Sequence, residues 1–151
     1  MNVIFLDIDG VLNGIEYVKA SGTNGLVVDP HRMKLLRKLV VATDSEIVLT
    51  ISWREHWSHD PDRCDHIGIA LNQLFRTYGM VIYDKTPDRN FQRDREILAW
   101  LADYPTVTGY IVLDDMTFSD PIVREHHIQT SDEAGGLTPR DIDAAIALFH
   151  A

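Results

Sequence analysis

Two aspartates lie two residues apart at the end of an apolar run near the N-terminus. Residues 3–6 contain no polar side chain, and Asp7, Ile8, Asp9 and Gly10 follow them directly. Carboxylates at the end of a buried strand are unfavourable unless a positive charge compensates them. Mg2+ is the simplest such charge, because it prefers oxygen ligands and takes few of them from protein. Gly10 lets the chain turn and brings its backbone close to a ligand.

Strands and helices are expected to alternate along the rest of the chain. Apolar runs predict strands, while apolar stripes at helical spacing and capping residues predict helices. Strands are expected at residues 3–6, 46–52, 80–83, 110–113 and 127–129, and helices at residues 30–40, 67–78, 93–104 and 138–148. This order predicts an α/β fold: a single Rossmann-like domain with a parallel sheet of about five strands and helices on both faces. Ligands bind beyond the carboxyl ends of the strands in such sheets, where Asp7 and Asp9 lie.

The segments between these elements are short. Residues 14–29 are predicted to form a flap-like excursion or hairpin, with a tight turn at Asn24 and Gly25. Residues 84–90 are polar and are expected to form a loop. A chain of 151 residues can bury a sizeable core, and no repeat or linker divides it. We therefore predict one domain over residues 1–151.

The composition disfavours a general nucleic-acid surface. Lys and Arg number 14 against 23 Asp and Glu, and the formal net charge of −9 is opposite to what phosphate backbones attract. Cys64 is the single cysteine, which excludes an intrachain disulfide and a cysteine zinc cluster. No apolar run approaches the length of a membrane helix, and no signal-like segment opens the sequence. These features predict a cytoplasmic protein without membrane association.

The stretch D-I-D-G-V-L-N at residues 7–13 resembles the first motif of the haloacid dehalogenase-like (HAD) phosphohydrolases. In that family the first aspartate attacks phosphorus and forms an aspartyl-phosphate. The second aspartate donates a proton to the leaving group and then accepts one from water. The resemblance implies these roles for Asp7 and Asp9, which suit an ionised nucleophile beside a proton shuttle. The alternative interpretation is an Asp-Gly turn in which Asp9 caps the backbone.

The second family motif is a Ser or Thr at the end of the second strand, whose hydroxyl binds the phosphoryl oxygens. Thr50 and Ser52 both match it, and at a spacing of two in a strand they would point to the same face. We favour Ser52, because it lies nearer the expected strand end and directly precedes Trp53 and Arg54. The other hydroxyl is expected to bond to local backbone.

The third family motif is a Lys or Arg that stabilises the charge on the transferring phosphoryl group. The candidates are Lys85, Arg89, Arg93 and Arg95. We favour Arg93, because it opens the helix that precedes the fourth strand, where the family places this residue. Lys85 is the alternative.

The fourth family motif is acidic and holds Mg2+. V-L-D-D at residues 112–115 matches it in type and position, with Asp114 as the expected direct ligand and Asp115 acting through water or in support of it. Asp115 as a helix N-cap is the alternative. The predicted metal site therefore comprises Asp7, Asp9, Asp114 and Asp115. Substrate contacts are expected from Gly10, Asn13, Trp53 and Arg54.

Four further stretches resemble HAD domains associated with bacterial RNA-repair proteins: T-I-S-W-R, R-x-x-E-I-x-x-W-L, L-D-D and G-L-T. The chain departs from them at Ile51, because those domains place a hydroxyl two residues before the Trp. The segments 14–29 and 53–92 are too short for a large cap domain, so the chain resembles the capless members. An open site accepts bulky substrates, such as polymer ends, or needs a partner to exclude water.

The sequence therefore predicts a Mg2+-dependent phosphatase that hydrolyses phosphate monoesters. Nucleotides, sugar phosphates, phosphoproteins and polynucleotide ends all fit as the phosphorylated substrate. One alternative is a receiver-like phospho-acceptor module, which is disfavoured because receivers place the acidic pair and the phosphorylated Asp on different strands. A second alternative is a non-catalytic interaction domain on a HAD scaffold, which has no need to keep acids at all three positions.

Overall fold

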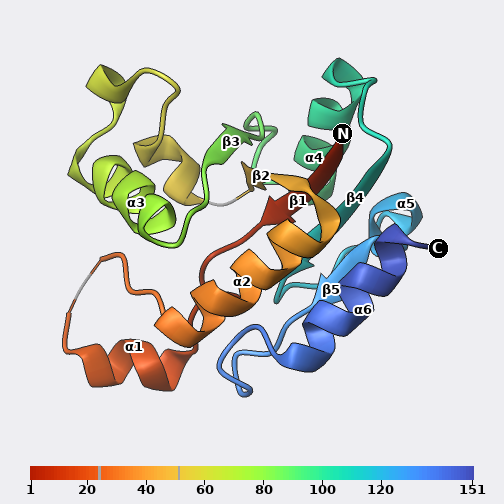
Figure 1. Cartoon of the computed structure of the whole chain (residues 1–151). Helices are drawn as coiled ribbons and strands as arrows, with labels where there is room; N and C mark the ends of the chain where they lie inside the picture. Colours follow the sequence, from red (N-terminus) through yellow and green to blue (C-terminus); the bar gives the residue numbers. More distant parts are fainter. Residues whose placement is uncertain (24, 51) are drawn as a thin grey trace.

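A parallel five-stranded sheet in the order β3-β2-β1-β4-β5 forms the centre of the protein (Figure 1). It is seen in a computed structural model that describes residues 1–23, 25–50 and 52–151, without the side chain of Ser52. The strands are β1 (Asn2–Leu6), β2 (Ser45–Leu49), β3 (Ile82–Lys85), β4 (Gly109–Asp114) and β5 (His127–Gln129). The helices are α1 (Ile15–Ser21), α2 (Pro30–Thr43), α3 (His66–Thr77), α4 (Arg93–Asp103), α5 (Pro121–Arg124) and α6 (Pro139–Phe149), with two 3-10 helices, η1 (Ser52–His56) and η2 (Pro61–Arg63). The predicted α/β class is confirmed.

The central strand β1 is buried on both faces, as its uninterrupted apolar run predicts. Ile4 and Leu6 belong to the core formed with α2, α3 and α6, whereas Val3 and Phe5 belong to the core formed with α4 and α5. All four side chains are fully buried. Alternate residues of a strand point to opposite faces, so each face of β1 binds its own layer of helices.

The strand register brings the ends of three strands together at one edge of the sheet. Leu6 pairs with Leu49 of β2 and with Leu113 of β4. The next residues continue this register, because the Thr50 amide donates to the Leu6 carbonyl at 3.1 Å and the Asp7 amide to the Leu113 carbonyl at 3.0 Å. Thr50, Asp7 and Asp114 thus lie side by side.

Two helix starts confirm the capping signals of the sequence. Asp29 caps α2 by accepting a hydrogen bond from the His31 amide, with Pro30 as the first helical residue. Thr138 and Asp141 form the reciprocal capping box of α6. Both signals are local, which is why they can be recognised without knowledge of the tertiary contacts.

Two predicted strand boundaries are wrong. β2 ends at Leu49 instead of Ser52, because the chain turns into η1 there. β3 covers residues 82–85 instead of 80–83. It includes the charged Asp84 because that carboxylate accepts hydrogen bonds from Trp100 Nε1 and the Tyr104 hydroxyl, both at 2.8 Å, which offset its burial.

The segment 14–29 contains the helix α1 instead of a hairpin. The amide of Ile15, at the start of this helix, donates to Asp132 Oδ1 at 3.0 Å. This capping group comes from a distant part of the chain, so no local signal announces the helix. The tight turn predicted at Asn24 lies outside the described residues.

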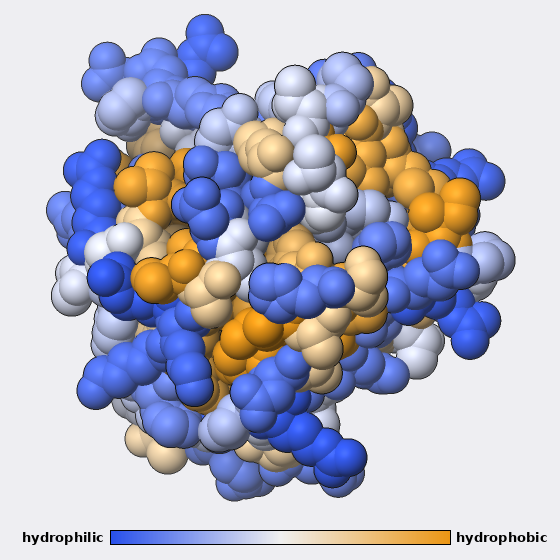
Figure 2. Space-filling view, turned by 45° about the vertical axis from the view of Figure 1, so that its right-hand side comes forward, coloured by the Kyte–Doolittle hydropathy of each residue, from blue (hydrophilic) through white to orange (hydrophobic). Residues whose placement is uncertain are grey.

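Exposed apolar side chains are scattered over the surface. Figure 2 shows several separate apolar patches, in orange, between hydrophilic residues on one face of the molecule. The most exposed large apolar side chains include Phe91 at 78% and Val81 at 70%. Within the described residues, no helix combines the length and the apolar character needed to span a bilayer.

Candidate active site

Three carboxylates converge at the carboxyl edge of the sheet. Asp7, Asp114 and Asp115 each offer an oxygen, and these oxygens lie within 4.8 Å of one another. Asp7 is 4% exposed and Asp114 is fully buried. The convergence follows from the register, because Asp7 and Asp114 directly extend paired residues of β1 and β4. Three oxygens at this separation fit the ligand preference of a hard divalent cation such as Mg2+.

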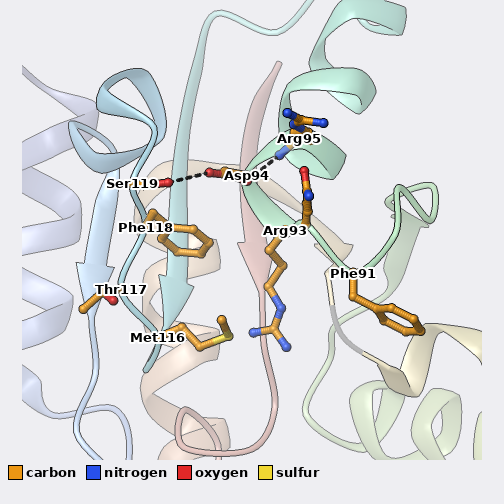
Figure 3. Close-up of a pocket in the computed structure, with 9 residues that line it drawn as sticks. Phe91, Arg93, Asp94, Arg95, Met116, Thr117, Phe118 and Ser119 are labelled. Atoms are coloured by element: carbon orange, nitrogen blue, oxygen red, sulfur yellow. Dashed lines mark hydrogen bonds between the residues drawn. The ribbon is translucent and has the colours of Figure 1, made fainter.

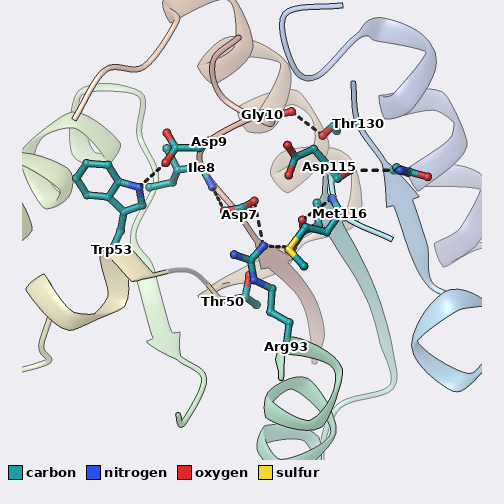
Figure 4. A network of polar contacts seen from close by, with 12 residues as sticks. Asp7, Ile8, Asp9, Gly10, Thr50, Trp53, Arg93, Asp115, Met116 and Thr130 are labelled. Atoms are coloured by element: carbon teal, nitrogen blue, oxygen red, sulfur yellow. Dashed lines mark hydrogen bonds and ion pairs between the residues drawn. The ribbon is translucent and has the colours of Figure 1, made fainter. Parts of the chain in front are cut away.

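Arg93 provides the positive charge of this site. Its Nη1 atom lies 2.6 Å from Asp114 Oδ2 and 3.2 Å from Asp7 Oδ2 (Figure 4). Arg93 is the first residue of α4, and α4 covers the face of β1 that carries Val3 and Phe5. Asp7 continues that alternation, so its side chain faces the start of this helix.

Burial and mutual repulsion raise the pKa values of two of the carboxyl groups, Asp7 and Asp115. Burial and the charge of Asp114 raise the pKa of Asp7 to about 8, although Arg93 opposes this shift. Burial and Asp114 also raise the pKa of Asp115. Burial lowers the pKa of Arg93, but the charges of Asp7 and Asp114 outweigh it and raise the pKa overall. One guanidinium therefore does not fully compensate three carboxyl groups, which leaves room for a second cation.

We expect the affinity for Mg2+ to rise with pH. With a pKa of about 8 in the metal-free protein, Asp7 holds a proton below that pH and must release it to bind a cation. Calorimetric titrations between pH 6 and 8 should show tighter binding by up to about tenfold per pH unit. The metal-free protein should lose stability as the pH rises from about 4 to 8, because its folded state binds the proton more tightly than the unfolded chain.

The Asp7→Asn variant is the control for this linkage, because it lacks the titrating group. Its stability should vary less with pH over the same range, as measured by the Tm in the presence of a chelator. A Mg2+ affinity of the native protein that is the same at pH 6 and pH 8 would contradict the assignment of Asp7 as a ligand.

Thr50 places a hydroxyl beside Asp7 and Arg93. The side chain is 1% exposed, and its Oγ1 atom has no hydrogen-bond partner among the described residues. Thr50 lines a small cavity of about 110 Å³ together with Arg93 and Met116. A buried polar atom without a partner is unfavourable, so this hydroxyl is poised to bind an oxygen of a ligand. The side chain of Ser52, the favoured candidate from the sequence, lies outside the described residues.

Asp9 lies apart from the three clustered carboxylates. It is exposed, and its Oδ2 atom accepts a hydrogen bond from Trp53 Nε1 at 3.1 Å (Figure 4). Its Oδ1 atom accepts a hydrogen bond from Asn13 Nδ2 at 3.0 Å. In the described part of the chain, the carboxylate cluster contains Asp7, Asp114 and Asp115 but not Asp9. The Asp9 side chain therefore lies outside this cluster, and its predicted role as a metal ligand stays a prediction. Its exposure leaves it free to exchange protons at the mouth of the site.

Gly10 and Asn13 shape the turn after β1. Gly10 has a φ of 81°, and a Cβ atom there would lie 2.3 Å from Asp115 Oδ2. Only glycine allows this turn and this approach to the carboxylate. Asn13 is 3% exposed and is used within the turn, because Oδ1 accepts from the Gly10 amide and Nδ2 donates to the Val27 carbonyl. These contacts make Asn13 a positioning residue for Asp9, and its predicted contact with substrate stays a prediction.

Arg54 and Lys85 bind protein atoms away from the carboxylates. Arg54 is 7% exposed and forms a two-fold ion pair with Glu96 at 2.8 and 2.7 Å. Lys85 Nζ donates to the carbonyls of Arg54 and Trp57, at 3.0 and 2.6 Å. Arg54 also lines the cavity that contains Thr50 and Arg93, so its predicted contact with substrate stays a prediction. The geometry places Arg93, and not the alternative Lys85, beside Asp7.

Two side chains at the mouth of the site were not singled out from the sequence. Phe91 and Met116 line the same cavity as Thr50 and Arg93. Met116 directly follows the two aspartates of the fourth motif, and this position in the sequence could have identified it as a residue near the site. Phe91 directly follows the polar segment 84–90, and its only signal is an apolar residue two positions before Arg93.

One comparison with known proteins identifies a family. The model of the family described as "HAD domain in Swiss Army Knife RNA repair proteins" matches residues 3–142. No curated protein and no solved structure matches the chain significantly. The matched range begins at Val3 of β1 and extends beyond β5, so it spans the residues from Asp7 to Asp115. The chain therefore belongs to the family of HAD domains found in Swiss Army Knife RNA repair proteins.

Proposed function

We propose that this protein is a Mg2+-dependent phosphohydrolase that cleaves phosphate monoesters through an aspartyl-phosphate on Asp7. One observation carries the proposal: the buried carboxyl of Asp7 shares a sheet edge with Asp114, Asp115 and the Arg93 guanidinium. This arrangement offers a nucleophile, oxygen ligands for a cation, and a donor for the phosphoryl oxygens within a few ångströms. Membership of the HAD family supports the same chemistry.

Asp7 and Asp9 take different roles because their environments differ. In the first step an Asp7 oxygen attacks phosphorus, the ester P–O bond breaks, and Asp9 donates a proton to the leaving oxygen. In the second step Asp9 takes a proton from water, the water oxygen attacks phosphorus, and the bond to Asp7 breaks to release phosphate. Asp7 is buried and Asp9 is exposed, which suits a fixed nucleophile and a proton shuttle.

The remaining residues of the site would bind the phosphoryl oxygens and the metal ion. Arg93 and Thr50 donate hydrogen bonds to the phosphoryl oxygens, on which negative charge is spread during the transfer. Asp7, Asp114 and Asp115 would hold Mg2+, which supplies neutralising charge between the carboxylates and the phosphoryl group when it is bound. Trp53 and Asn13 hold the Asp9 carboxylate at the mouth of the site.

The open edge of the sheet supports a bulky substrate. No cap domain covers the site in the described residues, since α1 and the η1–η2 segment are the only insertions near it. The printed family description adds a link to RNA repair. We therefore include phosphorylated polynucleotide ends among the substrates, next to nucleotides and other phosphate monoesters.

The proposal is tested with a panel of phosphomonoesters, including 5′- and 3′-phosphorylated oligonucleotides, assayed with Mg2+ and with a chelator. The expected result is multiple turnover that requires Mg2+, with phosphate released in excess of enzyme. A stable phosphoryl adduct that stops at one equivalent would instead favour a phospho-acceptor module. Absence of both turnover and Mg2+ binding would identify a non-catalytic HAD scaffold.

Arg93→Gln is expected to lower kcat by about 10²- to 10³-fold, the usual cost of losing one charged or polar donor to a transition state. The glutamine keeps a hydrogen-bond donor but loses the charge that faces Asp7 and Asp114. Lys85→Met is the matched variant, because Lys85 was the alternative for this role and lies against the carbonyls of Arg54 and Trp57. It should lower kcat less than about tenfold. A larger loss of kcat in Lys85→Met than in Arg93→Gln would instead assign the stabilisation of the phosphoryl charge to Lys85.

A further inference from the structure

Phe91 extends into solvent next to the catalytic edge. Its side chain is 78% exposed, the largest exposure among the large apolar residues described. It nevertheless lines the cavity that contains Thr50 and Arg93. Because this ring is not used in the core of the fold, its face is available to a ligand at the mouth of the site.

The backbone holds Phe91 in this position at a cost. Asn90 and Phe91 have φ values of 56° and 60°, in the left-handed region that residues with a Cβ atom disfavour. The segment is fastened by the Arg89 amide, which donates to Glu96 Oε2 at 2.9 Å. Glu96 is itself held by Arg54 in the buried ion pair. Strain that the surrounding structure maintains is typical of binding and catalytic sites.

Phe91 and Met116 lie on either side of the Arg93 guanidinium (Figure 3). Met116 is 47% exposed. The same side chains border a wider cleft of about 370 Å³, which Arg95 and Phe118 also line. A group esterified to a phosphate bound at Asp7 and Arg93 can extend into this cleft. The leaving group therefore meets an aromatic ring and a thioether, both of which favour flat, polarisable partners.

The apolar side chains at the mouth point to a nucleotide. Phe91 and Met116 line the cavity beside Arg93, where the ester group of a bound phosphate would lie. A nucleobase is a flat, polarisable ring that stacks on an aromatic side chain. We propose that Phe91 is a specificity-determining residue that stacks on the nucleobase of a nucleotide or polynucleotide-end substrate. The inference rests on the proposed phosphohydrolase function and names the substrate class of that site.

The test compares phosphate esters that carry a base with one that carries none. Phosphate release from adenosine 5′- and 3′-monophosphates is compared with release from ribose 5-phosphate for the native protein and Phe91→Ala. Loss of a stacked base should lower the kcat/KM ratio of the better nucleotide to ribose phosphate by about 5- to 100-fold. The kcat/KM for ribose phosphate itself should stay within about twofold. Phe91→Trp should retain the nucleotide preference, because its ring also stacks.

Val41→Ala is the matched control. Val41 is 66% exposed and lies two residues before the end of α2, next to the start of β2 at the opposite edge of the sheet. This variant should leave the nucleotide preference unchanged. Equal losses on nucleotide and ribose phosphate in Phe91→Ala, or no loss on either, would overturn the stacking role without affecting the assignment of Asp7 as nucleophile.

A binding measurement separates this inference from the catalytic proposal. The double variant Asp7→Asn/Phe91→Trp carries a tryptophan at the mouth, and adenosine monophosphate should quench its fluorescence while ribose 5-phosphate should not. The single variant Asp7→Asn corrects for the native tryptophans. Quenching without turnover in the native protein would overturn the phosphohydrolase proposal while keeping a nucleotide site. Turnover without quenching beyond that control would overturn the role of Phe91 alone.

Discussion

Replacement of Asp7 by asparagine is expected to reduce turnover of any accepted phosphomonoester by about four to six orders of magnitude, as removal of a nucleophile does. An amide oxygen cannot form the covalent intermediate. The geometry should survive, because the Asp7 Oδ1 atom accepts from the Ile8 amide at 2.8 Å and the amide oxygen of asparagine can accept the same bond. Steady-state assays with Mg2+ measure the loss of turnover, and circular dichroism of the variant checks that its fold is unchanged.

Asp103→Asn is the matched control for this change. Asp103 is exposed at the far end of α4, whereas Arg93 at its near end faces Asp7. The same chemical substitution there should leave turnover unchanged. The Asp7→Asn variant should also keep its stability, because it removes a carboxyl that repels Asp114. Undiminished turnover in a folded Asp7→Asn variant would end the nucleophile assignment.

Replacement of Arg54 by methionine is expected to lower the free energy of unfolding by about 3–5 kcal/mol, the usual cost of breaking a buried ion pair from one side. Glu96 is 1% exposed, and both of its oxygens face the Arg54 guanidinium. Without that partner the carboxylate is buried and uncompensated. Urea denaturation followed by circular dichroism measures the change, with the m-value checking that the transition stays two-state.

The double variant Arg54→Met/Glu96→Leu separates the ion pair from the packing of its side chains. It should recover much of the lost stability, because two apolar groups of similar volume can replace a buried pair. Arg63→Met is the control, since the pair of Arg63 with Asp60 lies at the surface, with side-chain exposures of 81% and 53%. It should leave stability essentially unchanged. A small loss in Arg54→Met would return Arg54 to the substrate-contacting role predicted from the sequence.

The ion pair also links stability to the proposed nucleotide site. Glu96 Oε2 accepts from both Arg54 and the Arg89 amide, and the latter bond fastens the segment that presents Phe91. Loss of Arg54 should therefore disturb the nucleotide preference as well as the fold. The buried pair would thus position residues at the mouth of the site through the Arg89 amide.

Most of the architecture was predictable because its signals are local. The apolar run of β1 predicts a strand buried on both faces, and Asp29 and Thr138 mark the starts of α2 and α6. The extent of β2 and β3 was not predictable in the same way. β3 contains Asp84, whose burial depends on hydrogen bonds from Trp100 and Tyr104 in another element. α1 begins at a cap that Asp132 supplies from more than a hundred residues away.

The acidic residues after two buried strands can be recognised from residue types and spacing, and the alternation of strands and helices implies that these acids meet at one edge of the sheet. The position of the basic candidates could not be read in this way. The register of β1 and β4 and the position of α4 place Arg93, and not Lys85, against Asp7 and Asp114. The fold also separates Asp9 from the other three carboxylates and pairs Arg54 with Glu96. Residue type and spacing set which face of a strand or helix a side chain takes, whereas its partner depends on contacts between residues far apart in the chain.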